Sequence, residues 1–449
     1  MRALAVALLR WLAEALVRLY YPRRTIDGAA NIPPGGPTLF VANHPNGLLD
    51  PLVFRVCSGR PVRFLAKSTL WGNPFGRLAM DAFRCMPVYR RQDVTVDQYG
   101  QSVARNEETF ARCRAELAAG AELALYPEGT SHADPNLKPL KSGAARIALS
   151  AATEGGAAPV LIPVGTHYED SAVFRSSVHL VVGLPIEFGE EVKELAIDQR
   201  RAIEHLTDKM RARLNELVLQ AETQEILAGV ARVASWTATD AEDDSHARRH
   251  TRTRELLAAY AILKARDPAR LEEVAQAARD YARALGHLGV RDPWTIEAPR
   301  VSVADTVLAL GRALLMLPAA IWGALTSWVP YRLSGVVARR MTSDVDVLST
   351  VKMIVGTTFL VVAWIVEAVV LGWRGGLAVG LASLVLAPLA GYAALRLGET
   401  LREVWEAFRH LGWRTRAPAL HKVGVHRRRL AEDVARALRE AAEQPHEIK

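Results

Sequence analysis

The sequence predicts an α/β domain that is followed by a helical segment and then by membrane-spanning helices. Between about residues 25 and 190, short apolar runs alternate with helical stretches, and Gly and Pro lie between them. From about residue 191 to 300, Ala, Glu, Arg and Leu recur with helical periodicity. Residues 301–398 then contain long runs with almost no charge, of a length that crosses a bilayer.

Composition narrows the class of protein and of partner. The 449 residues are 50% apolar and 23% charged, which excludes a disordered or fibrous chain and leaves room for two or three domains. An excess of 56 Lys and Arg over 48 Asp and Glu gives a net charge of +8. This charge favours an anionic partner, such as membrane lipids or a phosphorylated substrate. We expect no nucleic acid, because no motif combines basic and aromatic residues.

Neither a disulfide framework nor a metal site is expected. Cys57, Cys85 and Cys113 are scattered without the spacing of metal ligands, which favours a reduced compartment. His246 and His250 are spaced i, i+4 and could share a metal, but they lie in a charged run that is better interpreted as a solvated loop.

Residues 1–24 predict an amphipathic helix. Arg10, Glu14 and Arg18 share one helical face. Apolar residues occupy most of the remaining surface: Leu8, Leu9, Trp11, Leu12, Leu16, Leu19 and Tyr20. The segment lacks a small-residue cleavage site, so we expect it to be retained. It then either lies in the membrane interface or packs on the adjacent domain.

The α/β region, residues 25–190, is expected to carry the chemistry. The predicted strands are Thr38–Ala42, Val62–Ala66, Glu122–Tyr126, Val160–Val164 and Val178–Val182. The longest predicted helices are Val96–Ala119 and Ser142–Thr153. The motifs described below follow the ends of strands, which is where open α/β sheets build their sites. Residues 191–300 form a separate helical extension in this prediction.

Residues 301–398 predict two or three membrane helices. Ala313–Tyr331 and Gly375–Leu395 carry no charge, and Met353–Trp373 carries only Glu367. The turn sequence RGG at 374–376 joins the last two into a hairpin whose basic flanks place both ends in the cytoplasm. The first run contains two prolines, so a re-entrant or interfacial segment is the alternative. Residues 399–449 predict basic amphipathic helices suited to an anionic leaflet.

A histidine follows the first predicted strand in residues 43–51 (NHPNGLLDP). His44 leaves the strand into a turn set by Pro45 and Gly47, and Asp50 follows within reach. An imidazole, whose ordinary pKa is near ~6.5, can remove a hydroxyl proton, and a carboxylate on its other nitrogen fixes the tautomer. The pattern therefore favours His44 as a general base with Asp50 as its partner. Taken alone, the segment is equally typical of a polar loop.

Further motifs lie elsewhere in the predicted α/β region. Residues 125–132 (LYPEGTSH) run from a strand into a glycine turn whose amides and hydroxyls can hold phosphate. Residues 86–91 (MPVYRR) place Arg90 and Arg91 at a strand or loop end, where guanidinium groups bind phosphate in a bidentate way. Residues 64–67 (FLAK), 139–143 (PLKSG) and 161–165 (LIPVG) add Lys67, Lys141 and Pro163.

Between about residues 37 and 185, the chain has a His–Asp motif (43–51), an arginine motif (86–91), a Glu-Gly motif (125–132) and a proline motif (161–165), in that order. These four motifs and their order resemble those of the glycerolipid acyltransferase family. The resemblance implies a mixed sheet flanked by helices, with His44 as the catalytic base and Asp50 as its orienting partner. It also implies that Arg90 and the Glu128–Gly129 pair bind the acceptor phosphate and that Pro163 lies beside the thioester. The other implied substrate-binding residues are Thr130, Ser131, Lys67 and Lys141, and the two lysines are equally typical of solvated side chains.

The resemblance has three departures. Five residues separate His44 from Asp50, where the family usually has four and a branch resembling fungal glycerol-3-phosphate acyltransferases has a longer spacing. Ser131 and His132 replace the arginine that usually follows Glu-Gly-Thr, and Arg84 replaces a usual glycine.

The resemblance further implies an O-acyltransferase of phospholipid biosynthesis. The donor is acyl-CoA or acyl-ACP, used as a co-substrate without a cofactor, and the leading acceptor is 1-acyl-glycerol-3-phosphate. Glycerol-3-phosphate as acceptor, or a catalytically idle membrane scaffold, are the alternatives. The protein is expected to be integral to the membrane, with the catalytic domain on the cytoplasmic face.

Overall fold

The computed structural model of the chain describes residues 2–90, 93, 99–154, 158–239, 244–288, 303–413 and 417–443. It divides into two compact units. Unit 1 comprises Met1–Gln224 together with Thr342–Thr350, and unit 2 comprises Glu225–Met341 together with Val351–Lys449. A short segment far along the sequence therefore belongs to the N-terminal unit.

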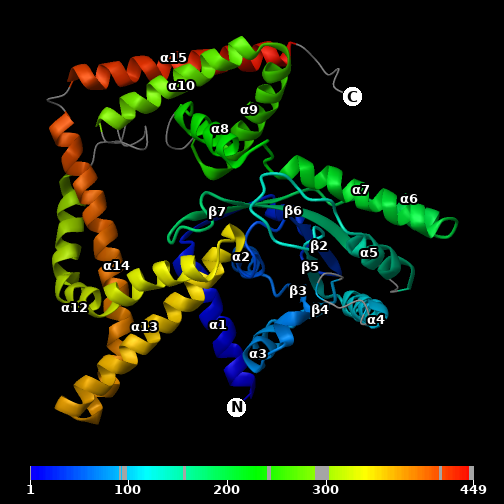
Figure 1. Cartoon of the computed structure of the whole chain (residues 1–449), viewed down its shortest axis with the longest axis horizontal. Coiled ribbons are helices and arrows are strands. Elements are labelled where there is room, and N and C mark those ends of the chain that lie inside the picture. Colours follow the sequence, from blue (N-terminus) through cyan, green and yellow to red (C-terminus); the bar gives the residue numbers. More distant parts are fainter. Residues whose placement is uncertain are drawn as a thin grey trace. The chain divides into compact units, whose positions relative to one another are not determined.

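Unit 1 is built on a mixed sheet, as expected, and the sheet has seven strands (Figure 1). Its order is β1-β7-β6-β2-β5-β3-β4, and β6 and β7 form the antiparallel pair. The neighbours from β6 to β4 are parallel, so their carboxyl ends lie at one edge. The strands are β1 (Arg23–Asp27), β2 (Thr38–Ala42), β3 (Arg63–Lys67), β4 (Met86–Val88), β5 (Glu122–Leu125), β6 (Val160–Tyr168) and β7 (Ser177–Val182).

Both faces of the sheet are buried by helices. Alternate residues of a strand point to opposite faces. Leu39 and Val41 of β2 belong to one core cluster, whereas Phe40 and Ala42 belong to the other. The first face is covered by α4 (Tyr99–Ala118), α5 (Gly143–Glu154) and α7 (Gln199–Leu217). The second is covered by α1 (Arg2–Tyr20), α2 (Leu49–Ser58) and α3 (Pro74–Ala82). Two 3₁₀ turns complete the unit: η1 (Ala29–Asn31) lies between β1 and β2 in the sequence, and η2 (Ser68–Trp71) lies between β3 and α3.

Unit 1 extends beyond the predicted boundary at residue 190. It includes α6 (Gly189–Leu195) and α7, and continues to Gln224. Leu206, Met210 and Leu214 of α7 are buried in the same core cluster as α5. Their burial makes α7 a covering layer of the sheet and not part of a separate helical extension.

Helix α1 packs on the sheet domain, and its place at a membrane interface stays a prediction. Val17 and Tyr20 are buried, and Arg10 donates from Nε to the carbonyl of Ala82 in α3, so the helix packs on the domain. Its opposite face leaves large apolar side chains in solvent: Leu4, Leu8, Trp11 and Leu12. This exposed row is the feature expected of a helix at a membrane interface.

Unit 2 is helical. Helices α10 (Pro268–Leu288) and α15 (Ala417–Ala442) pack together with α8 (Gln224–Trp236) and α9 (His246–Arg266) around the fully buried Tyr281 and Leu430. The other helices are α12 (Val303–Met341), α13 (Val345–Gly375) and α14 (Leu377–Trp413). His246 and His250, predicted to lie in a solvated loop, instead begin α9, and His250 is buried.

Three helices of the described chain are long and apolar enough to cross a membrane: Val307–Met341, Val345–Gly375 and Leu377–Arg402. Helix α12 continues through Pro318 and Pro330, so the first apolar run is one helix. It approaches α14 closely at Gly323, where an added Cβ would lie 1.9 Å from the carbonyl oxygen of Ala390. Small residues at such crossings are typical of helices packed in lipid.

Candidate active site

The parallel strands bring the sequence motifs to one edge of the sheet. His44 follows β2, the Glu128–Ser131 turn follows β5, Lys67 ends β3, and Arg90 follows β4. These strands are neighbours in the order β2-β5-β3-β4. Four segments that are separated in sequence therefore converge, as expected for a site at the carboxyl ends of parallel strands.

His44 and Asp50 are in contact. The Nδ1 atom of His44 lies 2.8 Å from Oδ2 of Asp50. Asp50 sits in the first turn of α2 and is 1% exposed, whereas the His44 side chain is 17% exposed. The longer spacing closes through Gly47, whose φ of +38° favours glycine, and through the carbonyl of Asn46, which accepts the Leu49 and Asp50 amides.

Asp50 receives two further hydrogen bonds. The Asn46 amide donates to Oδ2 at 2.8 Å, and the Tyr168 hydroxyl donates to Oδ1 at 2.6 Å. Because both oxygens act as acceptors, the ring nitrogen that faces Asp50 is the one that carries the proton. The arrangement leaves Nε2 of His44 as the basic nitrogen.

Two tyrosines surround this pair, and neither was singled out from the sequence. Tyr126 stacks on the His44 ring, with centroids 3.9 Å apart and planes 8° apart. Burial, reinforced by the charge of Asp50, raises the pKa of Tyr126 and Tyr168 well above the ordinary value for tyrosine. The stacked Tyr126 ring holds the imidazole plane in place, and the neutral Tyr168 hydroxyl holds the carboxylate by donating to it.

Glu128 faces the inside of the protein. Its side chain is fully buried, and Oε1 accepts the backbone amide of His44 at 3.1 Å. Oε2 accepts the Lys138 amide at 2.8 Å and also contacts Nε2 of His132. The His132 amide in turn donates to the carbonyl of His44 at 3.1 Å. The two loops are therefore tied together, and the contact of Glu128 with an acceptor stays a prediction.

Arg90 bonds the Gly129 turn, and the Lys141 side chain lies beside it. Gly129 has a φ of +75°, and a Cβ there would lie 3.4 Å from the Lys141 side chain. Arg90 donates from Nη1 to the carbonyl of Gly129 at 3.1 Å, while its Nε and Nη2 bond both oxygens of Asp93. The guanidinium charge is thus largely balanced by a carboxylate. Arg91 lies outside the described residues.

Three of the remaining predicted residues lie in different surroundings. Lys67 and Lys141 are exposed. Pro163 is buried within β6 opposite Val41, and its carbonyl accepts the Gly183 amide at 2.9 Å. Pro163 therefore lies inside the sheet and not at a strand end. Its position beside a thioester stays a prediction.

Two further contacts anchor the ends of the motifs. The Asn43 side chain pairs with the backbone of Thr166 in both directions, at 3.1 and 2.7 Å, which fixes the start of the His44 loop to β6. The Thr130 hydroxyl donates to the neighbouring Ser131 carbonyl, whereas the Ser131 hydroxyl donates to Asp346 at 2.5 Å.

Within the described residues, no group of three or more His, Cys, Asp or Glu is arranged to hold a metal.

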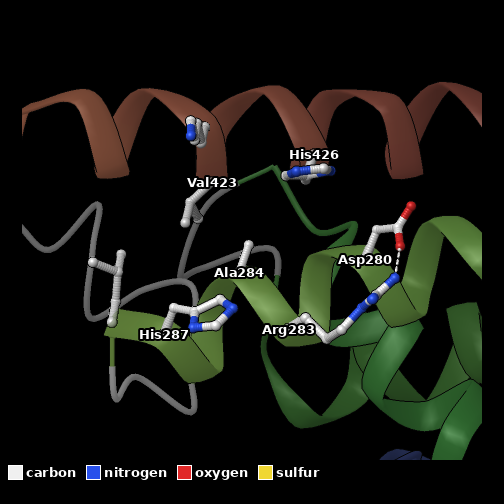
Figure 2. A pocket seen from close by; sticks show the side chains of 8 residues that line it. Asp280, Arg283, Ala284, His287, Val423 and His426 are labelled. Carbon is white, nitrogen blue, oxygen red and sulfur yellow. Dashed lines mark hydrogen bonds and ion pairs between the residues drawn. The ribbon is translucent and has the colours of Figure 1, made fainter.

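A pocket of about 490 Å³ lies elsewhere, between α10 and α15 of unit 2 (Figure 2). Arg283 and His287 of α10 and His426 of α15 line it, and Arg283 pairs with Asp280. No residue of the four motifs lines this pocket. It is thus separate from the His44 site.

Comparison with known proteins gives matches over the sheet domain. Residues 23–167 match the family model described as Acyltransferase. An uncharacterized acyltransferase of Schizosaccharomyces pombe is 25% identical over 299 residues, which cover 48% of this chain and 44% of the relative. Glycerol-3-phosphate O-acyltransferase 2 of Saccharomyces cerevisiae is 36% identical over 94 residues, 20% of this chain and 13% of the relative.

The chain thus spans less than half the length of each of these curated relatives. Among solved structures, the 1-acyl-sn-glycerophosphate acyltransferase of Thermotoga maritima is 17% identical with a TM-score of 0.32. The match covers 47% of this chain and 80% of that chain.

Proposed function

Since residues 23–167 form an acyltransferase domain of the glycerolipid acyltransferase family, we propose that the chain transfers a fatty acyl group from a thioester to a hydroxyl of a glycerol phosphate. The observation that carries this proposal is the His44–Asp50 pair, 2.8 Å apart beside the Glu128–Gly129 turn. An oriented, partly exposed imidazole next to a glycine turn provides a base and a place for an anionic acceptor.

The proposed reaction needs no covalent intermediate on the protein. Nε2 of His44 takes the proton of the acceptor hydroxyl while the hydroxyl oxygen forms a bond to the thioester carbonyl carbon. Backbone amides stabilise the resulting oxyanion. When the carbon–sulfur bond breaks, the sulfur leaves with the proton that His44 had taken. Asp50 stabilises the imidazolium between these two transfers.

The donor in this proposal is acyl-CoA or acyl-ACP. The acceptor phosphate binds beside the Gly129 turn, and Arg90 supports the turn through the Gly129 carbonyl. The partners of the phosphate are Thr130, Ser131, Lys141 and Lys67. The acceptor first expected is 1-acyl-glycerol-3-phosphate. Glycerol-3-phosphate is the second candidate, and two observations favour it: the name of the yeast relative and the five-residue spacing between His44 and Asp50.

The proposal places the protein in a membrane, with the sheet domain on the cytoplasmic face. It is supported by the three helices long and apolar enough to cross a bilayer and by the exposed row that includes Leu8 and Trp11 on α1. The net charge of +8 suits anionic lipid headgroups at that surface.

The test is an assay of membrane fractions with a labelled acyl thioester, offering glycerol-3-phosphate and 1-acyl-glycerol-3-phosphate in parallel. Replacement of the base, His44→Ala, should lower kcat by about a thousandfold, within the range of general-base catalysis. His205→Ala is a matched control. The Nδ1 atom of His205 also lies 2.8 Å from a carboxylate oxygen, that of Glu194, but His205 belongs to α7 and not to the strand-end site.

Each outcome has a distinct meaning. Unchanged activity of His44→Ala would refute the general-base assignment. A parent protein that acylates neither acceptor would favour the idle scaffold. Product from glycerol-3-phosphate alone would overturn 1-acyl-glycerol-3-phosphate as the first acceptor.

A further inference from the structure

Unit 1 contains a segment that none of the motifs includes. Residues Thr342–Thr350, which lead into α13 and form its first turns, pack with the sheet domain. Ser349 donates its hydroxyl to Oδ1 of Asn46, although the two residues are 303 positions apart. Asp346 accepts the hydroxyl of Ser131 at 2.5 Å. The segment thus contacts both the His44 loop and the Gly129 turn.

Asn46 is the residue through which this contact reaches the catalytic pair. Its backbone amide donates to Asp50 Oδ2 at 2.8 Å, the same oxygen that faces His44. Its carbonyl accepts the amides of Leu49 and Asp50, which begin α2. The position of the Asn46 main chain therefore sets where the Asp50 carboxylate lies.

The Asn46 side chain is held from two sides. Its Nδ2 donates to the Tyr21 hydroxyl at 2.8 Å, and its Oδ1 accepts from Ser349. Asn46, Tyr21 and Ser349 are all 0% exposed, so water does not replace either partner. A buried amide with both ends occupied has one orientation, and Ser349 supplies one of the two bonds that fix it.

The backbone of the segment is also close to the loop. A Cβ at Gly47 would lie 3.1 Å from the carbonyl oxygen of Asp346 and 3.7 Å from Oγ1 of Thr350. Gly47 is the residue whose positive φ closes the His44–Asp50 turn. The start of α13 therefore lies against the tightest point of that turn, and a side chain at position 47 would push the two apart.

We propose that Ser349 is a positioning residue of the active site: its hydroxyl fixes Asn46, and Asn46 holds Asp50 against His44. The His44 loop is then completed by the first turns of an apolar helix, and not by the sheet domain alone. This inference rests on the proposed acyl transfer, since it makes Ser349 a positioning residue for His44, the proposed base of that reaction.

The test compares three substitutions in the full-length protein. Ser349→Ala removes the hydroxyl, and Ser349→Cys keeps the shape with a weaker donor. Ser383→Ala is the matched control, because Ser383 is also buried in an apolar helix but bonds the Gly380 carbonyl of its own helix. We expect kcat to fall by about tenfold or more in Ser349→Ala, with KM for both substrates within about twofold of the parent, because a misplaced base loses transition-state stabilisation only.

A double-mutant cycle separates positioning from general destabilisation. If Ser349 acts through Asn46, then Ser349→Ala should cost little more once Asn46→Ala is present. Ser349→Cys should give an intermediate kcat. Independent losses at positions 46 and 349, or an equal loss in Ser383→Ala, would overturn the proposal.

A second measurement does not depend on acyl transfer. The rate at which diethyl pyrocarbonate modifies His44, followed by peptide mass spectrometry, reports the surroundings of the ring. We expect Ser349→Ala to change this rate at least about threefold and Ser383→Ala to leave it unchanged. An unchanged rate in Ser349→Ala would refute the positioning role. A changed rate in a protein that acylates no glycerol phosphate would support that role and count against the proposed function.

Discussion

Glu128 gives the sharpest test of how the site is built, because sequence and structure assign it different contacts. The family resemblance implies that it contacts the acceptor phosphate. In the structure its carboxylate is fully buried and accepts the backbone amides of His44 and Lys138. The substitution Glu128→Gln keeps the shape of the side chain but replaces one acceptor oxygen with an NH₂ donor.

The cost of Glu128→Gln is similar whichever oxygen is replaced. With NH₂ at the Oε2 position, the Lys138 amide loses its acceptor, while the NH₂ group can donate to Nε2 of a neutral His132. With NH₂ at the Oε1 position, the His44 amide loses its acceptor. Either orientation forfeits one hydrogen bond to a charged group and leaves a buried N–H unpaired, a loss of about 3 kcal/mol in the free energy of unfolding.

The kinetic consequence distinguishes the two roles of Glu128. If it holds the His44 loop, Glu128→Gln should lower kcat by about ten- to a hundredfold and leave KM for the acceptor nearly unchanged. Denaturant unfolding in detergent and steady-state kinetics measure both effects. Glu191→Gln is the control, since Glu191 is also a buried carboxylate, but it lies in α6 and pairs with Lys209 of α7. A raised acceptor KM at constant kcat would refute the positioning role.

Three further results are expected. Tyr168→Phe should lower kcat about tenfold without changing KM, because it removes the 2.6 Å bond to a buried oxygen of Asp50; an unchanged kcat would contradict this. Asp346→Asn should lower KM for the phosphate acceptor about fivefold and leave KM for the thioester unchanged. The reason is that a carboxylate at the Ser131 hydroxyl repels phosphate by about 1 kcal/mol in a partly solvated site. A higher acceptor KM would contradict this prediction. Maleimide labelling near neutral pH, followed by mass spectrometry, should be slow until the protein is unfolded and should accelerate as pH rises, because burial raises the thiol pKa to about 11 for Cys57 and Cys85 and about 12 for Cys113.

The central strands could be predicted because their apolar runs are continuous. Strand β2 was predicted with its observed bounds, Thr38–Ala42, since both of its faces are buried. The two edge strands were not predicted. The sequence RRTID of β1 is polar and partly exposed, and β4 has three residues including Pro87, so neither shows the pattern of a buried strand.

The contacts within the site were predictable only in part. The convergence of His44, Glu128 and Arg90 follows from strand ends in a parallel sheet. The bond between Arg90 and Asp93 and the inward direction of Glu128 do not, because they depend on loop conformations that spacing does not set. Tyr126 directly follows β5, and its stacking on His44 leaves no distinct pattern in the sequence.

The contact between Ser349 and Asn46 shows where local inference ends. Nothing in the spacing of residues 43–51 indicates a partner 303 positions away, and Ser349 itself is an ordinary polar residue before an apolar run. Yet the buried side-chain amide of Asn46 finds its partners outside the turn, in Tyr21 and Ser349. Buried polar groups need hydrogen-bond partners. The start of α13 supplies one of the two partners of this side chain, so the geometry of the base depends on a helix that the motif does not contain.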